Sequence, residues 1–277
     1  MIAALAEFMD TQLKTILLKD YRPPAYTIEE VALGVDLFED RARVCSRLVC
    51  RRNTGTAPEA PLVLQGRNLV LKGVTLDDVA LTPDHYHVDT ETLTLAAVPE
   101  RFVLGIETEL YPQNNTSLDG LYRSSGNFCT QCEAEGFRKI TYFLDRPDVL
   151  ARYEVTITAE QARYPVLLAN GNRVDAGVLD GGRHYARWQD PYPKPSYLFA
   201  MVAGNLVKIS DTFVTRSGRQ VALEIYVQAH NRDKCGHAME SLKKAMAWDE
   251  ETFGLEYDLD QYMIVAVDDF NMGAMEN

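Results

Sequence analysis

Several familiar signatures of function are missing from this sequence of 277 residues. No apolar run approaches the roughly 18 residues that a membrane-spanning helix requires. There is no glycine-rich loop of the kind that cradles phosphates. The motif His-Glu-x-x-His, which presents two imidazoles to a catalytic metal ion, surrounds none of the 5 histidines. These absences exclude a helical membrane anchor, a P-loop and a metallopeptidase centre of that type within this stretch of sequence.

Basic residues are also scarce. The 28 lysines and arginines face 40 acidic residues, which gives a formal net charge of −12. Because contacts to phosphates require clustered lysine and arginine side chains, this balance argues against broad binding to nucleic acids or to anionic membranes.

The 5 cysteines form an odd-numbered set that is too sparse for a disulfide-built protein, and it favours reduced thiols in the cytoplasm: Cys45, Cys50, Cys129, Cys132 and Cys235. The sequence "CTQC" (129–132) has the spacing of a redox pair or half a zinc site. A redox pair would need a βαβ context, and zinc would need a second pair of Cys or His ligands. Neither accompanies this motif, so two ordinary thiols are favoured, with redox activity as a remote alternative.

The first 18 residues resemble a signal peptide only superficially. No basic residue precedes their apolar segment, and Glu7 and Asp10 interrupt it. Apolar residues recur at steps of three and four, which predicts a short amphipathic helical extension over residues 1–18.

Period-two alternation of apolar and polar residues, typical of strands, extends to about residue 205, as in "YTIEEVALGVDLF", "LVLQGRNLVLKGVTL" and "TLTLAAVPERFVLGIETEL". Asn170-Gly171 and Asp180-Gly181 each predict a tight hairpin. The segment "QDPYPKPSY" contains Pro191, Pro193 and Pro195, so it is expected to be a loop or crossing segment.

A different pattern follows residue 205. Two strands are predicted on either side of Ser217-Gly218, and "DKCGHAMESLKKAMAWDEETFG" predicts a helix capped by Gly254. Its apolar face would be formed by Met239, Leu242, Met246 and Phe253. The run "QYMIVAVDD" predicts a strand buried on both faces. It leads into "NMGAMEN", a glycine-containing segment with one carboxylate, which suggests the lip of a binding cleft.

The last of these segments resembles a known family. "GAMEN" (273–277), behind "YMIVAVDDFNM", is similar to the exopeptidase motif of the gluzincin, or M1-type, zinc aminopeptidases, which include bacterial aminopeptidases N. "TQCEAEGFR" (130–138) and the flanking "YPQNNTSLDGLYRS" and "ITYFLDRPDVLARYEVTI" match a second family segment. The resemblance extends from about Lys19 to the last residue. It implies a mainly β fold: a saddle-shaped antiparallel β domain over 19–205, followed by the incomplete start of a thermolysin-like α/β catalytic domain over 206–277.

The resemblance also implies roles for individual residues. Glu276 would bind the α-ammonium group of a peptide together with Glu133, and Gly273 and Ala274 would line the peptide backbone. Met275 and Asn277 complete the motif, while Met272 and Gln131 would border the pocket for the first side chain. Two carboxylates in a partly desolvated cleft make strong charge-assisted hydrogen bonds to an ammonium group. An amine held at a fixed place would let only the first peptide bond reach the catalytic centre.

The implied activity is the zinc-dependent removal of N-terminal amino acids from peptides by a monomeric cytoplasmic enzyme. In this family the zinc ligands and general base follow "GAMEN". The chain is therefore expected to be an N-terminal portion that holds no metal ligand or catalytic residue and is inactive alone. Two alternatives remain open: a non-catalytic scaffold or binding relative, and the epoxide-hydrolase branch of the family, which is expected to carry Gln at the position of Glu133.

Overall fold

The computed structural model describes residues 17–277. The helix predicted over residues 1–18 therefore lies outside the described residues, apart from its last two positions. The described chain begins with a short 3-10 helix, η1 (Leu18–Asp20). No helix within residues 17–277 is both long and apolar enough to cross a membrane.

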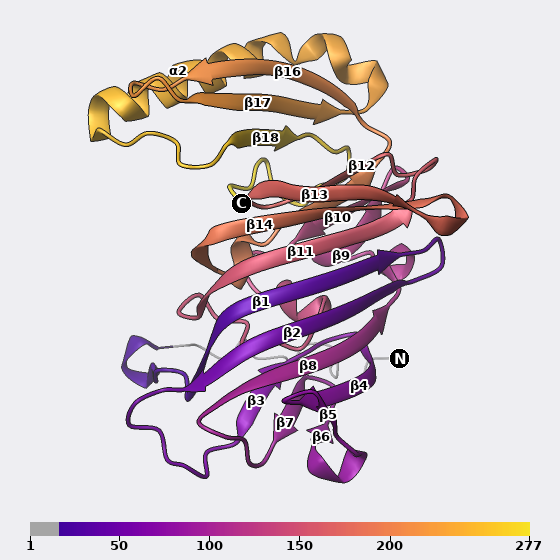
Figure 1. The fold of residues 1–277 in the computed structure, drawn as a ribbon, viewed down its shortest axis with the longest axis vertical. Helices are drawn as coiled ribbons and strands as arrows, with labels where there is room; N and C mark the ends of the chain where they lie inside the picture. The colour runs from indigo at the N-terminus through magenta and orange to yellow at the C-terminus, as the bar shows by residue number, and fades with distance from the viewer. Residues whose placement is uncertain (1–16) are drawn as a thin grey trace, which may run out of the picture.

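A large twisted sheet forms the body of the molecule, with the strand order β13-β14-β11-β1-β2-β8-β4-β5 (Figure 1). Its members are β1 (Tyr26–Leu37), β2 (Ala42–Arg52), β4 (Val70–Leu76), β5 (Val79–Ala80), β8 (Arg101–Leu110), β11 (Leu150–Glu160), β13 (Asn172–Leu179) and β14 (Arg183–Pro195). Neighbouring strands are antiparallel except β1 and β11, which pair in parallel. Alternate side chains of β1 are buried, as the period-two pattern predicts.

Three smaller sheets complete the β structure. One has the order β12-β15-β10-β9, formed by β9 (Gly120–Ser124), β10 (Asn127–Gln131), β12 (Val166–Ala169) and β15 (Met201–Gly204). The second has the order β3-β7-β6, formed by β3 (Leu62–Gln65), β6 (His87–Val88) and β7 (Thr92–Leu95). The third has the order β16-β17-β18, formed by β16 (Val207–Val214), β17 (Gln220–Val227) and β18 (Gln261–Val265).

Within residues 17–277, helical structure is confined to short 3-10 turns and one longer element, α2 (Gly236–Phe253). The 3-10 turns that follow η1 are η2 (Pro83–His85), η3 (Pro112–Asn114), η4 (Phe137–Lys139), η5 (Asp180–Gly182), η6 (Ser196–Leu198) and η7 (Ala229–Lys234). The predicted mainly β fold, with one long helix near its end, is confirmed.

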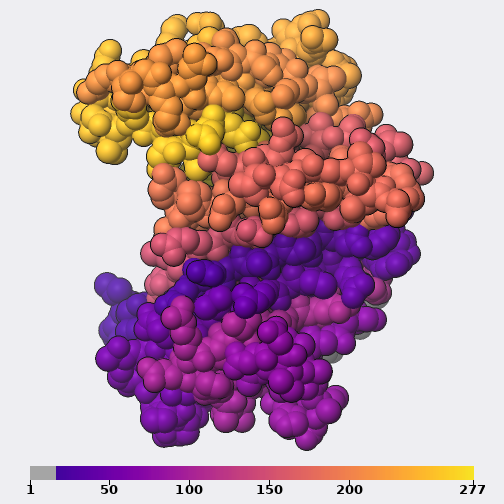
Figure 2. Space-filling view, in the orientation of Figure 1, coloured from indigo at the N-terminus to yellow at the C-terminus, as the bar shows by residue number. Residues whose placement is uncertain are grey.

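Two hydrophobic cores hold these layers together. The larger one lies between the eight-stranded sheet and the smaller sheets beside it, and at its centre Phe137 packs edge-on against Phe143 and Phe199, at centroid distances of 4.8 and 5.1 Å. The second core lies between α2 and the sheet β16-β17-β18, which form a separate layer at one end of the molecule (Figures 1 and 2). Apolar burial of this extent is the main favourable term in folding.

Of the two predicted hairpins, only one exists. Leu179 pairs with Arg183 across a turn that contains Asp180-Gly181, so β13 and β14 form the expected hairpin. The hairpin prediction at Asn170-Gly171 is wrong, because β12 pairs with β15 and β13 pairs with β14. At this point the chain passes from one sheet to another. Gly171 has φ +84°, and a Cβ atom there would lie 2.2 Å from the carbonyl oxygen of Gln189.

The proline-rich segment is also not the predicted loop, because β14 continues as a strand to Pro195. Pairing with β13 ends at Gln189, so beyond this residue β14 has a hydrogen-bonded neighbour only in β11. The β11 pairing itself shifts register between Ala151 and Tyr153. Proline is tolerated where one side of a strand is unpaired and where the ladder is irregular.

Helix α2 agrees with its prediction except at its end. Met239, Leu242 and Met246 are buried, and Gly254 caps the helix at φ +68°. Phe253, predicted on the buried face, is 62% exposed. It packs instead against the exposed ring of Trp248, at a centroid distance of 5.4 Å.

The prediction that the run before "NMGAMEN" is buried on both faces is likewise wrong. Strand β18 covers Gln261–Val265, and each of its residues is only half-buried. Within residues 17–277 it pairs with β17 alone, in parallel, so it forms one edge of its sheet. Its side chains alternate between the two cores, with Tyr262 and Ile264 on one and Met263 and Val265 on the other. They stay half-buried because the strand lies at a sheet edge and borders a cavity.

Candidate functional site

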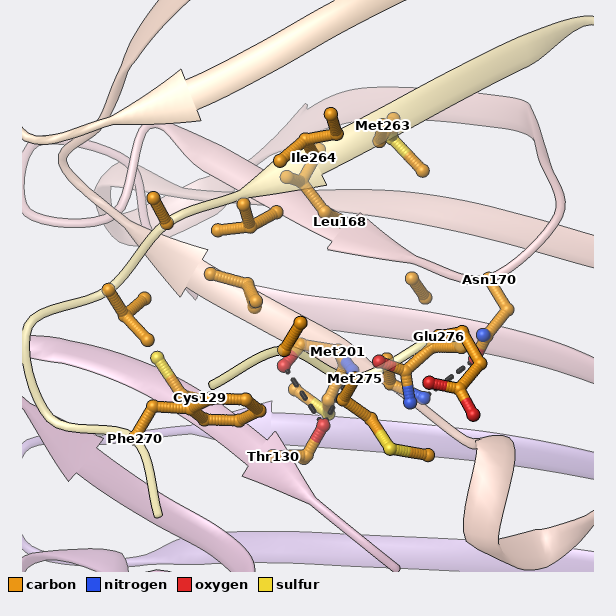
Figure 3. Close-up of a pocket in the computed structure, with 18 of the residues that line it drawn as sticks. Cys129, Thr130, Leu168, Asn170, Met201, Met263, Ile264, Phe270, Met275 and Glu276 are labelled. Carbon is orange, nitrogen blue, oxygen red and sulfur yellow. Dashed lines mark hydrogen bonds between the residues drawn. The ribbon is translucent and has the colours of Figure 1, made fainter. Parts of the chain in front are cut away.

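A cavity of about 650 Å³ lies between the sheet β12-β15-β10-β9 on one side and β18 with the segment 266–277 on the other (Figure 3). This volume falls within the range of small-molecule and peptide sites. Its lining includes Thr130 from β10, Leu168 from β12, Met201 from β15 and Ile264 from β18. The cavity is thus formed where the last strand and the segment after it cross the smaller sheet.

The lining is mostly apolar and soft. Met201, Met263, Met272 and Met275 contribute thioethers, next to the ring of Phe270. Methionine is flexible and polarisable, so a wall of this kind adapts to apolar groups of different shape.

Most polar atoms of the lining are already paired. The Oγ1 atom of Thr130 accepts a 2.8 Å hydrogen bond from the backbone N–H of Met201, and the Oδ1 atom of Asn170 accepts one of 2.7 Å from the N–H of Ala200 (Figure 3). Asp190 is bonded to Lys194, which is buried with it.

Glu276 differs from these groups. It lies at the wall of the cavity and is exposed, and its carboxylate makes no hydrogen bond or ion pair with any of residues 17–277 (Figure 3). A carboxylate that is free to accept hydrogen bonds, beside an otherwise apolar and paired surface, can bind a cationic group.

The segment that carries Glu276 is fastened to the β9–β10 hairpin. The hydroxyl of Ser124 donates to Oδ2 of Asp269 at 3.0 Å and accepts from the backbone N–H of Asp269 at 3.0 Å. The hydroxyl of Tyr122 donates to the carbonyl oxygen of Asp269, also at 3.0 Å. Burial raises the pKa of Tyr122, which keeps its hydroxyl a donor at neutral and moderately alkaline pH.

Further contacts lie closer to the cavity. The Nε2 atom of Gln131 donates to Sδ of Met272 at 3.0 Å, and the Nδ2 atom of Asn277 donates to the carbonyl oxygen of Leu198 at 3.3 Å. The side chain of Gln131 is almost completely buried, and its Oε1 atom has no hydrogen-bond partner in the part of the chain that the structure describes. A buried acceptor without a partner is costly, and Gln131 is not among the residues that line the cavity.

Six of the eight predicted substrate-binding residues line the cavity together: Met272, Gly273, Ala274, Met275, Glu276 and Asn277. Gln131 stands behind Met272 through their hydrogen bond. Glu133, two residues after the end of β10, is exposed and is not among the residues that line the cavity. The pairing of Glu133 with Glu276 around one ligand therefore stays a prediction.

Sequence reasoning missed Tyr122, Ser124 and Asp269 as residues that hold the site. Ser124 and Tyr122 lie in a strand whose residues are nearly all buried, so the alternation that identifies half-buried strands gives no sign of them. The only available signal was the pair Asp268-Asp269 directly after an apolar strand, where two adjacent carboxylates need partners.

The surroundings of the two thiols of "CTQC" do not favour a redox role. Cys129 and Cys132 are both buried and free. Burial raises the pKa of Cys129 to about 12 and raises that of Cys132 well above its ordinary value. A reactive thiol pair requires the opposite shift.

Comparison with known proteins identifies the class. Residues 68–198 match the peptidase M1 N-terminal domain, and residues 237–277 match the peptidase family M1 domain. Together these matches cover more than half of the chain. The first match falls in the part that forms the larger core, and the second falls in the part that includes α2. The chain belongs to peptidase family M1.

Particular relatives are similar over nearly its whole length. Aminopeptidase N of Caulobacter vibrioides is 54% identical over 264 residues, which is 95% of this chain and 30% of the relative. Aminopeptidase N of Escherichia coli is 54% identical over 258 residues, which is 93% of this chain and 29% of the relative. The crystal structure of Legionella pneumophila aminopeptidase A in complex with aspartic acid superposes with a TM-score of 0.88 at 39% identity, and the match covers 92% of this chain and 30% of that one. The chain thus spans less than a third of the length of these proteins.

Zinc, on which M1 aminopeptidases depend, does not fit the donors described here. Within residues 17–277 no group of three or more His, Cys, Asp or Glu side chains lies close enough to hold a metal ion. A zinc site needs at least three such protein ligands, so no catalytic step can be derived through zinc from these residues.

Proposed function

We propose that this chain is the N-terminal part of a zinc-dependent aminopeptidase that removes N-terminal amino acids from peptides, and that it contributes part of the site for the substrate's α-ammonium group. The observation that carries this proposal is the unpaired carboxylate of Glu276 at the wall of an apolar cavity, in a chain 54% identical to aminopeptidase N. The residues 19–205 and 206–277 would be the N-terminal domain and the start of the catalytic domain.

Charge explains why a carboxylate suits this task. A free peptide N-terminus differs from every internal peptide group by its positive charge, so an anion in a partly desolvated cavity selects it. Glu133 would add a second negative charge, and Gln131 would border the pocket from behind Met272. Gly273 has no atom within 4 Å of the place where a Cβ would stand, so a peptide backbone could approach it closely.

The hydrolytic step belongs to residues beyond those described. Bound zinc would supply an activated water and polarise the scissile carbonyl group, and its ligands would come from the remainder of the family M1 domain. The contribution of this chain is to hold the amine in place, which limits attack to the first peptide bond. By itself the chain would cleave nothing.

The remaining attributes follow from composition and the thiols. Peptides with a free N-terminus would be the partners, and nucleic acids and membranes would not, given the net charge of −12. The 5 cysteines are all free, which suits a reducing compartment and supports the cytoplasm as its location. A monomer remains our proposal from the family resemblance.

The test uses the full-length protein and alanyl-4-nitroanilide, with N-acetylalanyl-4-nitroanilide as the blocked analogue. We expect release of nitroaniline from the free amine only. Glu276→Gln and Glu133→Gln should each lower kcat/KM by roughly 100-fold or more, because each removes a charge that faces the ammonium group. Glu251→Gln, which removes an exposed carboxylate of α2, is the matched control and should leave the rate unchanged.

Two results would overturn the proposal. If Glu276→Gln kept near-normal activity, the amine assignment would be wrong. If the full-length protein bound peptides without cleaving them, it would instead be a non-catalytic relative that serves as a scaffold or binding module.

A further inference from the structure

The strongest polar contact between the terminal segment and the rest of the molecule is centred on Asp269. Its backbone N–H, its carbonyl oxygen and its carboxylate are all engaged by two neighbouring side chains of β9, Ser124 and Tyr122, at 3.0 Å in each case. With the segment in place Ser124 is 1% exposed and Tyr122 is 0% exposed, so these hydrogen bonds are shielded from water. We call these three residues the β9 clamp.

The hairpin that carries the clamp is itself rigid. Strands β9 and β10 pair over five consecutive positions, from Asn127 with Ser124 to Gln131 with Gly120. Every residue of β10 is buried. Residues attached to opposite ends of such a hairpin are therefore held at a constant distance from each other.

The same hairpin reaches both halves of the expected amine site. Asp269 lies seven positions before Glu276, and the segment between them is contacted again where Gln131 bonds to Met272. Glu133 follows the end of β10 by two residues. Glu133 and the segment that carries Glu276 are therefore both attached to the β9–β10 hairpin, although 143 positions separate the two residues in the sequence.

We propose that the β9 clamp is a positioning device for the amine site: Ser124 and Tyr122 hold Asp269, and through it set the place of Glu276 relative to the β9–β10 hairpin and Glu133. This inference rests on the proposed function and adds three positioning residues to it. Ser124 and Asp269 are not among the residues that line the cavity, whereas Tyr122 borders it while its hydroxyl is engaged by Asp269. Their effect on substrate is transmitted through the anchoring carboxylate.

The expected consequence is a selective loss of amine binding. A hydrogen bond to a charged group is stronger than a neutral one, and a displacement of about 1 Å in a positioned group can cost up to 100-fold in rate. Release of Asp269 should therefore raise KM for a free-amine substrate by roughly tenfold, with a smaller effect on kcat.

The experiment removes the clamp from the hairpin side, so that the sequence 266–277 is untouched. In the full-length protein, Ser124→Ala is combined with Tyr122→Phe, which deletes both hydroxyls and keeps the aromatic ring. KM and kcat for alanyl-4-nitroanilide are measured, together with the thermal midpoint. Asp233→Ala, which removes an exposed carboxylate in η7, is the control that should change neither constant.

A double-mutant cycle then separates positioning from general stability. The clamp variant is repeated in a Glu276→Gln background, where the anchor it positions no longer carries charge. We expect the roughly tenfold increase in KM to shrink to less than about twofold there, because residues that act as one unit are not additive. An increase of the same size in both backgrounds would overturn the proposal.

A second variant covers the case in which the hairpin variant does not fold. Asp269→Ala removes the carboxylate from the segment side, and Asp269→Asn keeps an oxygen that can accept from Ser124. KM should rise for the alanine variant and be largely restored for the asparagine variant; equal values for the two would contradict the clamp. A wild-type protein without aminopeptidase activity would refute the proposed function, whereas an active wild type with an unchanged KM in the clamp variants would refute only the clamp.

Discussion

The amide nitrogen Nε2 of Gln131 donates a 3.0 Å hydrogen bond to the thioether sulfur of Met272, across 141 positions of sequence. This contact joins the end of β10 to the segment that lines the cavity. Two residues that the family resemblance assigned to one pocket are thus joined in the fold.

Removal of this sulfur should loosen the terminal segment. Met272→Leu keeps the volume of the side chain but leaves the buried amide of Gln131 without a partner, a loss of about 1–3 kcal/mol. Amide hydrogen exchange of residues 266–277 should then accelerate by about tenfold, since local opening is governed by such contacts. Met263→Leu, at a cavity methionine whose thioether accepts no hydrogen bond from residues 17–277, should leave exchange as it is.

The ion pair between Arg138 and Asp145 should be among the most sensitive polar contacts. Asp145 is 3% exposed and accepts from the backbone N–H and Nε of Arg138, at 3.1 and 3.0 Å. Asp145→Ala would remove the buried partner of the guanidinium group and leave it only the exposed Glu135, at 3.2 Å, as an ionic partner. This should lower the free energy of unfolding by about 3 kcal/mol in urea titrations.

The contrast for this prediction is a pair at the surface. Arg67 and Glu91 lie 2.7 Å apart with both side chains about half exposed. Glu91→Ala should cost less than about 1 kcal/mol, because water screens exposed pairs. A similar loss for both variants would contradict the role assigned to burial.

Two glycines with almost the same backbone angle should respond very differently to alanine. Gly171 (φ +84°) has the carbonyl oxygen of Gln189 2.2 Å from the place of a Cβ, whereas Gly218 (φ +87°) has no atom within 4 Å. Gly218→Ala should cost about 1–2 kcal/mol from backbone strain alone. Gly171→Ala adds a clash between two sheets, and its thermal midpoint should fall much further.

Burial of thiols predicts how stability depends on pH. The ordinary thiol pKa is 9.0, and burial raises that of Cys129 to about 12. Between these values the unfolded chain loses a proton that the folded chain keeps, so the free energy of unfolding should fall as pH rises above about 9. Urea titrations at pH 8 and pH 10 measure this loss, and Cys129→Ala should reduce it.

The elements that sequence patterns predicted well are those whose burial alternates. Strand β1 shows apolar and polar residues in turn because one of its faces meets the core, and α2 shows three apolar residues at helical spacing for the same reason. The prediction at Phe253 was wrong because the helix extends past the layer on which it packs, and periodicity cannot tell where that layer ends.

The pairing partners of the strands were harder to predict from the sequence. Asn170-Gly171 has the chemistry of a hairpin turn, yet its flanking strands join different sheets, since local turn propensity does not specify partners. The three prolines of β14 led to the prediction of a loop. A strand can, however, be paired on both sides for part of its length and on one side only beyond it, as β14 is.

The site was predicted chiefly through resemblance. The role of the last residues was predicted from the motif "GAMEN". The structure brings six of the eight predicted substrate-binding residues to one cavity. The support beneath them was not predictable, because the contact of Ser124 with Asp269 joins positions 145 apart and leaves no local pattern.

Strand β1 lies in the middle of the large sheet, between β2, which follows it at once, and β11, which is more than 110 residues away. During synthesis β1 can pair with β2, and β2 with β8, but the other edge of β1 stays open until β11 has left the ribosome. Contacts between residues far apart in the sequence form late and slow folding, and until they form the backbone groups of the strand edge stay unpaired. The nascent chain would therefore be most prone to aggregation and most dependent on chaperones in this interval, and residues 150–160 mark where that vulnerable period closes.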